Sequence, residues 1–221
     1  MLNDRVSSSY YQELRHPMLS LIRGTPKSVL EIGCASGQTL AYMHNQGAEY
    51  TVGVEFSPEA AEEAKVRKGV NRILVGDIER MYLDLEPASF DLLIAGHVLE
   101  HLADPWKSLR RLRAFLKPGG QLVAGLPNVR NQSVLFPLLL RGRWQYEPSG
   151  IMDWTHLRFF SRQTIQDLLE ATGFQVERIV PEFGRKSRLA SAATLHLFED
   201  LLCFAYNVSA IRTANGFHHH G

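Results

Sequence analysis

Cysteine, net charge and long apolar runs are all scarce in this sequence of 221 residues. Its two cysteines, Cys34 and Cys203, are too few and too differently placed to predict a disulfide framework or a zinc site. Lys plus Arg number 24 against 23 Asp plus Glu, so a formal net charge of +1 gives no general attraction to nucleic acid. No apolar run reaches the length of a membrane span, and the first residues lack the basic and apolar segments of a signal peptide. We therefore expect a cytoplasmic monomer or homodimer with no stable membrane insertion and no nucleic-acid partner.

Apolar segments alternate with amphipathic ones along most of the chain. This alternation is typical of βαβ units, and 45% apolar content suffices for one core, so we expect a single α/β domain over residues 1–221 with a doubly wound, parallel sheet. The predicted strands are 28–33, 50–55, 72–76, 90–95, 120–126, 174–180 and 204–211. The predicted helices are 37–46, 58–68, 105–116, 162–172 and 188–203. Residues 1–26 are expected to supply a helix that covers a ligand site, with Tyr10 and Tyr11 as contacts, and residues 214–221 a disordered or non-native tail.

The segment from Val29 to Gly37 joins an apolar strand to a turn of small residues. Gly33 and Gly37 let the backbone approach a ligand where a Cβ would collide, and the helix that follows points its N-terminal amides at an anionic group. Glu31, at the strand end, can bind an ammonium group or brace the loop. A turn of this kind also occurs with no ligand, so it needs support from elsewhere in the chain.

That support comes from acids at the ends of the next two strands. Glu55 lies about twenty residues further on, where dinucleotide folds place the acid that accepts both ribose hydroxyls. Asp77 follows the third strand and can accept a hydrogen bond from an exocyclic amine. Phe56 and Ile78 stand beside these acids and can enclose a flat base. One such acid alone is commonly a solvated strand end, but three at successive strand ends indicate a nucleotide-like ligand.

With EIGCASG, GVEFS, GDIE and FDLLIAGHVLEHL, the sequence resembles the class I S-adenosylmethionine-dependent methyltransferases. The resemblance implies a Rossmann-like, seven-stranded, mostly parallel sheet with a lid after strand five, and S-adenosylmethionine as cofactor. It also implies that the glycine turn holds the methionine part, Glu55 the ribose and Asp77 the adenine amine. Ala35 stands where many members carry glycine, and the dinucleotide pattern of oxidoreductases is missing. The expected cofactor-binding residues are Glu31, Gly33, Cys34, Ala35, Gly37, Glu55, Phe56, Asp77, Ile78 and Gly96.

The fourth predicted strand ends in a segment with two histidines and an acid. If Gly96–His101 turns helically, then His97, Glu100 and His101 share one face. Such a group can act as a general base, can bind a divalent metal, or can simply brace the sheet. Ubiquinone-pathway O-methyltransferases and some RNA 2′-O-methyltransferases hold a metal at similar positions, but this chain has His97 where those have an acid. A metal on Glu100 and His101 is therefore an alternative and not the expected cofactor.

Residues 127–160 form an unusually long connection, as functional lids commonly do. Its segment Asp153–Phe160 combines a histidine, an aspartate and an arginine with aromatic side chains, which suits an acceptor pocket. The run from GRW to THLRFF resembles methyltransferases of surface-polysaccharide and secondary-metabolite biosynthesis. We expect Arg143, Trp144, Asp153 and Arg158 to bind the acceptor, although solvated arginines and a packed apolar lid would give the same pattern.

These observations together predict an S-adenosylmethionine-dependent methyltransferase that methylates oxygen on a small-molecule or glycan acceptor. Removal of the hydroxyl proton needs a base, and the candidates are His101, His156 and, after them, His97. A nucleic-acid or protein methyltransferase would use the same cofactor site and stays as an alternative. A cofactor-binding or regulatory protein without turnover is the second alternative.

Overall fold

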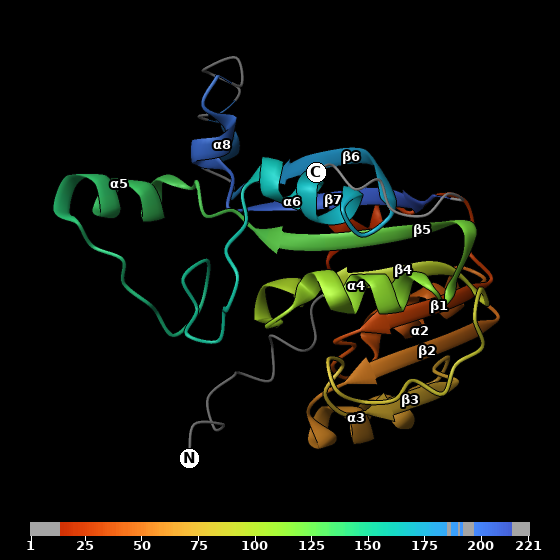
Figure 1. The fold of residues 1–221 in the computed structure, drawn as a ribbon. Helices are drawn as coiled ribbons and strands as arrows, with labels where there is room; N and C mark the ends of the chain where they lie inside the picture. The colour runs from red at the N-terminus through yellow and green to blue at the C-terminus, as the bar shows by residue number, and fades with distance from the viewer. Residues whose placement is uncertain (1–13, 185–186, 190, 192–196, 214–221) are drawn as a thin grey trace.

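The computed structural model describes residues 14–184, 187–189, 191 and 197–213. These residues form one seven-stranded sheet of order β3-β2-β1-β4-β5-β7-β6 (Figure 1). The strands are β1 (Ser28–Ile32), β2 (Tyr50–Glu55), β3 (Arg72–Val75), β4 (Phe90–Gly96), β5 (Leu116–Pro127), β6 (Phe174–Glu182) and β7 (Ala205–Arg212). β7 pairs antiparallel with both β5 and β6, and the other neighbouring strands pair parallel. The predicted doubly wound, mostly parallel sheet is thereby confirmed.

Helices cover both faces of this sheet. The described helices are α1 (His16–Leu19), α2 (Gln38–Asn45), α3 (Pro58–Lys65), the 3₁₀ helix η2 (Leu99–His101), α4 (Pro105–Arg113), α5 (Gln132–Arg141), α6 (Arg162–Glu170) and α8 (Glu199–Leu202), of which α5 lies outside both faces. The helix starts follow from the sequence. Ser57 caps α3 by accepting a hydrogen bond from the amide of Ala60, with Pro58 in the first turn, and Ser161 forms a capping box at α6.

Two apolar layers hold the helices to the sheet, because successive strand residues face opposite sides. In β1, Leu30 and Ile32 belong to a core with α4 and α6, whereas Val29 belongs to a second core with α1 and α2. Leu109 of α4 and Leu40 of α2 are fully buried representatives of the two layers. Because β3, β2, β1 and β4 are parallel neighbours, their carboxyl ends lie side by side at one end of the sheet. The loops that follow these strands can meet there.

Three predicted helices have other boundaries in the structure, and the one predicted over 58–68 ends at Lys65. The helix predicted over 105–116 ends at Arg113, and β5 begins at Leu116 instead of residue 120. Leu116 pairs with Phe90 before a register shift in β4, so tertiary pairing extends the strand through the Pro-Gly-Gly segment. The helix predicted over 188–203 is interrupted, because residues 197–198 form a turn before α8. Tyr10 and Tyr11 lie outside the described residues.

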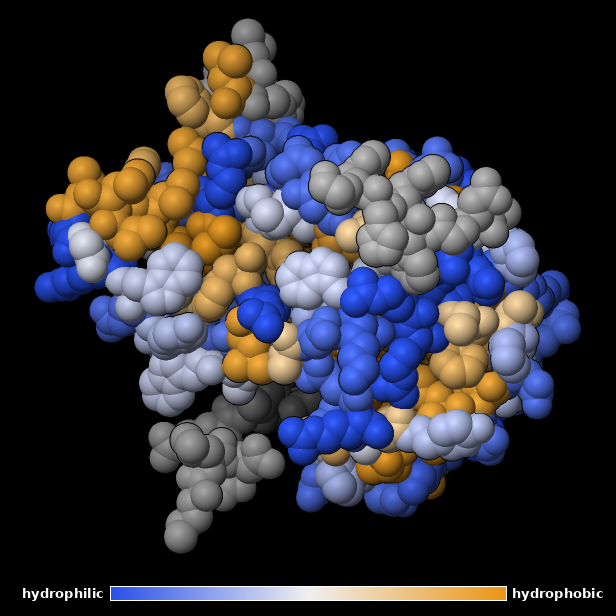
Figure 2. All heavy atoms as spheres, viewed as in Figure 1, coloured by the Kyte–Doolittle hydropathy of each residue, from blue (hydrophilic) through white to orange (hydrophobic). Residues whose placement is uncertain are grey.

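The predicted lid contains a helix that the sequence pattern did not indicate. Helix α5 follows β5 and, with the loop after it, extends beyond the carboxyl ends of the strands (Figure 1). Only Val134 of α5 is buried, and Leu139 and Leu140 are 73% and 80% exposed. Hydrophobic side chains gather over this helix in Figure 2. No described helix is long and apolar enough to cross a membrane.

Candidate active site

The turn after β1 needs glycine at its first position. Gly33 has φ of +65°, and a Cβ there would lie 2.4 Å from Cγ2 of Val98. Its amide donates to the Val54 carbonyl of the neighbouring strand at 2.8 Å. Gly37, with φ of +75°, begins α2 as its N-cap. Ala35 also has a left-handed φ of +47°, which explains why glycine is the usual residue there and gives this chain a small backbone strain.

Cys34 fills the space beneath the turn. Its thiol is buried, burial raises the pKa of that thiol, and a Cβ at Gly53 of β2 would lie 2.4 Å from its sulfur. Cys34 therefore packs the turn against β2 as a neutral side chain.

Glu55 ties the turn to the end of β2. One carboxylate oxygen accepts the amide of Ala35 at 2.7 Å, and the other accepts the amide of Ser57 at 2.9 Å. Each oxygen has a second lone pair for a further donor. Two fixed amide donors hold the carboxylate in one orientation at the predicted ribose position.

Glu31 lies buried beneath the same turn. Burial raises the pKa of its carboxyl to about 8; a hydrogen bond with Thr39 acts in the opposite direction, and the nearby Glu55 adds to the rise. Its Oε2 has no hydrogen-bond partner within the described structure. A buried acceptor without a donor is costly, so this atom suits a cationic ligand group.

The predicted adenine residues lie in different environments. Asp77 Oδ1 accepts the amide of Glu79 at 2.9 Å, while Oδ2 lies 3.4 Å from Nε of Arg80. Phe56 is 73% exposed, and Ile78 is buried in the core beneath α4.

Gly96 is the last residue of β4, and the first described residues of the chain pack against it. A Cβ at Gly96 would lie 3.2 Å from Cε of Met18 and 3.6 Å from Cδ of Arg15. The segment around α1 therefore packs directly over the end of β4.

A carboxylate and two imidazoles meet beyond the end of β4. Glu100 and His101 belong to η2, and His156 comes from the lid; one potential metal-ligating atom from each lies within 4.8 Å of the others. The two imidazole rings are 4.7 Å apart, centroid to centroid. Glu100 is 1% exposed, and His156 is 7% exposed. The structure thus brings together candidate residues from two segments that are far apart in the sequence.

Backbone carbonyls fix the tautomers of both histidines. His101 Nδ1 lies 3.2 Å from the Thr155 carbonyl oxygen, and His156 Nδ1 lies 2.9 Å from that of Ile151. A carbonyl oxygen only accepts, so each Nδ1 carries a proton, and in the neutral ring Nε2 carries the lone pair. Thr155 also donates its hydroxyl to Asp153 at 2.6 Å and lies 3.0 Å from His101 Nδ1.

His97 approaches the same carboxylate from the end of β4. It has a left-handed φ of +57° outside η2, and its Nδ1 lies 3.3 Å from Oε1 of Glu100. Burial alone would raise the pKa of the Glu100 carboxyl, but a hydrogen bond with His97, the positive charge of His97 and a further contribution of His101 outweigh burial and lower it. The expected contact between His97 and Glu100 is present, although the segment is not one continuous helix.

Backbone hydrogen bonds hold the lid against η2. The amides of Leu157 and Arg158 both donate to the Glu100 carbonyl, at 2.8 and 2.9 Å. The Arg158 guanidinium donates to the Ala103 carbonyl. Arg158, predicted to bind the acceptor, therefore holds the lid in place over the cluster.

Aromatic side chains line the lid beside His156. Phe159 contacts Trp144 at 5.0 Å, Tyr146 at 6.0 Å and His156 at 6.5 Å between ring centroids. Trp144 is 42% exposed, whereas Phe160 is buried in the core. An exposed aromatic wall therefore continues outward from the buried histidine.

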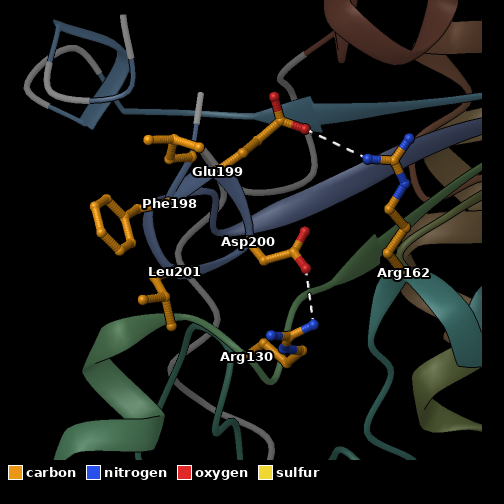
Figure 3. Close-up of a pocket in the computed structure, with 7 residues that line it drawn as sticks. Arg130, Arg162, Phe198, Glu199, Asp200 and Leu201 are labelled. Carbon is orange, nitrogen blue, oxygen red and sulfur yellow. Dashed lines mark hydrogen bonds and ion pairs between the residues drawn. The ribbon is translucent and has the colours of Figure 1, made fainter. Parts of the chain in front are cut away.

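Acids of α8 pair with one arginine of the lid and with one arginine just after it. Arg130 pairs with Asp200 at 2.8 Å and Arg162 with Glu199 at 3.5 Å (Figure 3). Asn128, which the sequence pattern did not single out, donates to the carbonyls of Asp200 and Cys203. Arg143, by contrast, lies in an exposed stretch of the lid.

A family model described as a methyltransferase domain matches residues 6–179, which is more than half of the sequence. The chain belongs to the methyltransferase-domain family. The cofactor of this methyltransferase domain is S-adenosylmethionine, as the resemblance implied.

Individual relatives are more distant. A ubiquinone biosynthesis O-methyltransferase of Neisseria meningitidis is 28% identical over 136 residues, which cover 58% of this chain and 56% of the relative. One from Cereibacter sphaeroides is 29% identical over 149 residues, covering 66% and 59%. The chain thus spans little more than half the length of these curated relatives. A solved S-adenosylmethionine-dependent methyltransferase from Mesorhizobium loti has a TM-score of 0.64 at 18% identity, covering 89% of this chain and 96% of that one, and shows the shared fold.

Proposed function

We propose that the chain transfers a methyl group from S-adenosylmethionine to a hydroxyl oxygen of a small-molecule or glycan acceptor. The observation that carries this proposal is the pair of histidines beyond β4, each with Nδ1 protonated against a carbonyl and Nε2 left as a base. A hydroxyl acceptor must lose its proton during methyl transfer, whereas a neutral amine needs no base before attack. The names of the O-methyltransferase relatives support the same type of acceptor.

The cofactor fits the groups around the glycine turn. The unpartnered Oε2 of Glu31 suits the ammonium of the methionine part, and Gly33 keeps the turn free of a Cβ. The fixed Glu55 carboxylate has lone pairs for two ribose hydroxyls, and Asp77 is held by the amide of Glu79 for an adenine amine. S-adenosylmethionine supplies an activated methyl group, so these residues contribute chiefly alignment.

His101 is our first candidate for the base and His156 the second. The Asp153 carboxylate and the Thr155 hydroxyl fix the His101 ring, as a carboxylate does behind a catalytic histidine. His97 contacts Glu100 and so acts on the site through that carboxylate.

The acceptor is expected to lie against the lid. Trp144 offers an exposed aromatic face, and Arg143 adds positive charge for an acceptor that carries phosphate or a nucleotide. Asp153 and Arg158 shape this wall by holding Thr155 and η2 in place. A glycan acceptor fits an aromatic wall with polar groups, which is why surface-polysaccharide synthesis is included in the proposal.

Methyl-labelled S-adenosylmethionine tests the proposal against a panel of nucleotide sugars, lipid-linked glycans, phenols, amines and RNA. We expect label on oxygen of a hydroxylated acceptor, and a kcat lower by about 100-fold or more for His101→Gln, the range that loss of a general base gives. His44→Gln is the matched control, because His44 Nδ1 also contacts a backbone carbonyl but lies on α2. Label on amines or RNA alone, or full turnover by both His101→Gln and His156→Gln, would refute the proposed reaction.

A further inference from the structure

The apolar face of α5 is exposed. Phe136, Leu139 and Leu140 are spaced three and four residues apart, so they share one face of the helix, and all three are exposed. Val134, on the opposite face, is the buried residue of α5. A surface helix of a globular domain ordinarily turns its apolar face toward the core. Helix α5 does the reverse and presents this face to whatever covers it from outside.

Residues at the start of α8 extend the apolar face. Leu197 is 79% exposed and Phe198 is 52% exposed. Figure 2 shows hydrophobic side chains over α5 and near α8 on the same side of the molecule, and in Figure 3 Leu201 of α8 points toward α5. Exposed apolar patches with several contributing side chains mark interaction sites. The α5–α8 surface, as we call it, consists of Phe136, Leu139, Leu140, Leu197 and Phe198.

The charge beside the α5–α8 surface is positive. Arg141 ends α5 and Arg143 follows it, both are exposed, and residues 132–146 include no acid. The acids of α8 leave this charge in place, because Glu199 and Asp200 each pair with an arginine outside that segment. Exposed leucines bordered by cations are typical of helices that bind anionic lipid surfaces.

We propose that the α5–α8 surface binds reversibly to an anionic lipid bilayer. Helix α5 lies along the plane of the lipid headgroups, with Leu139 and Leu140 at the boundary of the acyl chains and Arg141 against lipid phosphates. Binding of this kind needs no spanning segment, and no described helix is long and apolar enough to be one. It agrees with the expectation of no stable membrane insertion, because the chain lies on the bilayer and does not cross it.

A second copy of the chain is the other candidate to cover this surface. A two-fold contact places the same residues of both copies opposite one another. The Arg141 side chains of the two copies would then approach each other, and residues 132–146 contain no acid to pair with them. An anionic bilayer supplies the opposite charge. The charge pattern therefore favours the bilayer.

Bilayer binding also orients the molecule. Helix α5 extends beyond the carboxyl ends of the strands and belongs to the same connection as His156 (Figure 1). The acceptor side of the candidate site therefore lies near the lipid surface when α5 is bound to it. Binding requires neither an acceptor nor methyl transfer, so this inference is independent of the proposed reaction.

Co-sedimentation of the full chain with lipid vesicles tests the proposal. One set of vesicles contains phosphatidylcholine and phosphatidylglycerol in equal parts, and the other contains phosphatidylcholine alone. We expect the wild type to partition onto the anionic vesicles about 10-fold or more better than onto the neutral ones, and NaCl to weaken this preference. Inorganic phosphate at the concentration of the lipid phosphate should not release the protein, because it offers no apolar phase to the leucines.

Variants assign the binding to this surface. Leu139→Ser combined with Leu140→Ser should lower partitioning onto the anionic vesicles about 10-fold or more, and Arg141→Ala should lower it about fivefold. Val66→Ser, after α3, and Arg110→Ala, on α4, are the matched controls; both side chains are exposed, and both variants should bind as the wild type does. Circular dichroism and S-adenosylmethionine affinity, measured on the same samples, should be unchanged.

The proposal is overturned if the double leucine variant partitions like the wild type, or if the wild type binds neutral and anionic vesicles equally or not at all. Analytical ultracentrifugation identifies the other occupant: a wild-type dimer that the double leucine variant loses, without vesicle binding, would assign the surface to a second copy. A chain that binds anionic vesicles as described but methylates only amines would keep the docking surface and refute the O-methylation.

Discussion

At the scale of single residues, the buried Glu31 predicts a pH dependence of stability. Its pKa is about 8 in the fold against an ordinary value of 4.5, so between these values the folded state binds more protons than the unfolded state. The free energy of unfolding therefore falls as pH rises through this window. We expect Glu31→Gln to gain stability relative to the wild type from about pH 5 to about pH 8, measured as the difference in denaturant midpoint.

The exposed Glu63 provides the control for that experiment. Glu63→Gln should follow the wild type at every pH, since its side chain stays in water in both states. If Glu31→Gln and wild type keep a constant difference across the range, the Glu31 carboxyl does not titrate as the structure indicates.

The glycine turn gives a second prediction for a single residue. Gly33→Ala combines a left-handed φ with a contact of 2.4 Å to Val98, whereas Gly24→Ala has a φ of +55° and nothing within 4 Å. We expect a loss of about 1–2 kcal/mol for Gly24→Ala from backbone strain, and about 1–3 kcal/mol more for Gly33→Ala. Urea unfolding measures both, and equal losses would show that Val98 yields without cost.

Residue types at strand ends were predictable because the βαβ pattern fixes where they lie. Glu31, Glu55 and Asp77 follow strands whose parallel order could be inferred, so their common edge could be inferred as well. The hydrogen-bond partners of each carboxylate could not be inferred from the sequence. That Ala35 donates to Glu55, for example, depends on a left-handed alanine in the turn.

At the scale of elements, α4 and α5 are helices of similar length with opposite burial. Leu109 of α4 is fully buried, whereas Leu140 of α5 is 80% exposed. We expect Leu109→Ala to cost about 2–5 kcal/mol of unfolding free energy and Leu140→Ala less than about 0.5 kcal/mol. Thermal or urea unfolding distinguishes them, and a large loss for Leu140→Ala would mean that α5 is covered.

The same contrast explains which elements were predictable. Helix α4 has an apolar stripe at helical spacing behind an Asp104 cap, which the sequence displays. Helix α5 has Pro137 in its interior and apolar side chains that do not face the core, so periodicity gave no signal. Its Asn131 cap and the left-handed Gly142 after it were the available indications.

At the scale of the whole molecule, the candidate site joins segments that are distant in the sequence. The residues proposed to bind the cofactor follow β1, β2 and β3, and the cluster opposite them comes from η2 and the lid. The first group follows from topology and was predictable. The second depends on how the lid folds back, through the amides of Leu157 and Arg158 to the Glu100 carbonyl, and only the structure shows it.

This arrangement predicts that the lid acts on the acceptor side alone. Arg158→Ala removes the contact with the Ala103 carbonyl and should raise the acceptor KM about 10-fold while leaving S-adenosylmethionine affinity unchanged. Arg143→Ala should raise KM only for acceptors that carry phosphate. A loss confined to cofactor binding in either variant would contradict the division of the site.

The central claim is that the glycine turn and the strand-end acids form the S-adenosylmethionine site. Isothermal titration calorimetry of S-adenosylmethionine against wild type, Glu55→Ala and Glu49→Ala tests it most directly, since Glu49 precedes β2 at the opposite end of that strand and is exposed. We predict one site per chain, a Kd higher by about 10-fold or more for Glu55→Ala and an unchanged Kd for Glu49→Ala. Equal affinity of all three proteins, or no binding to the wild type, would contradict the account.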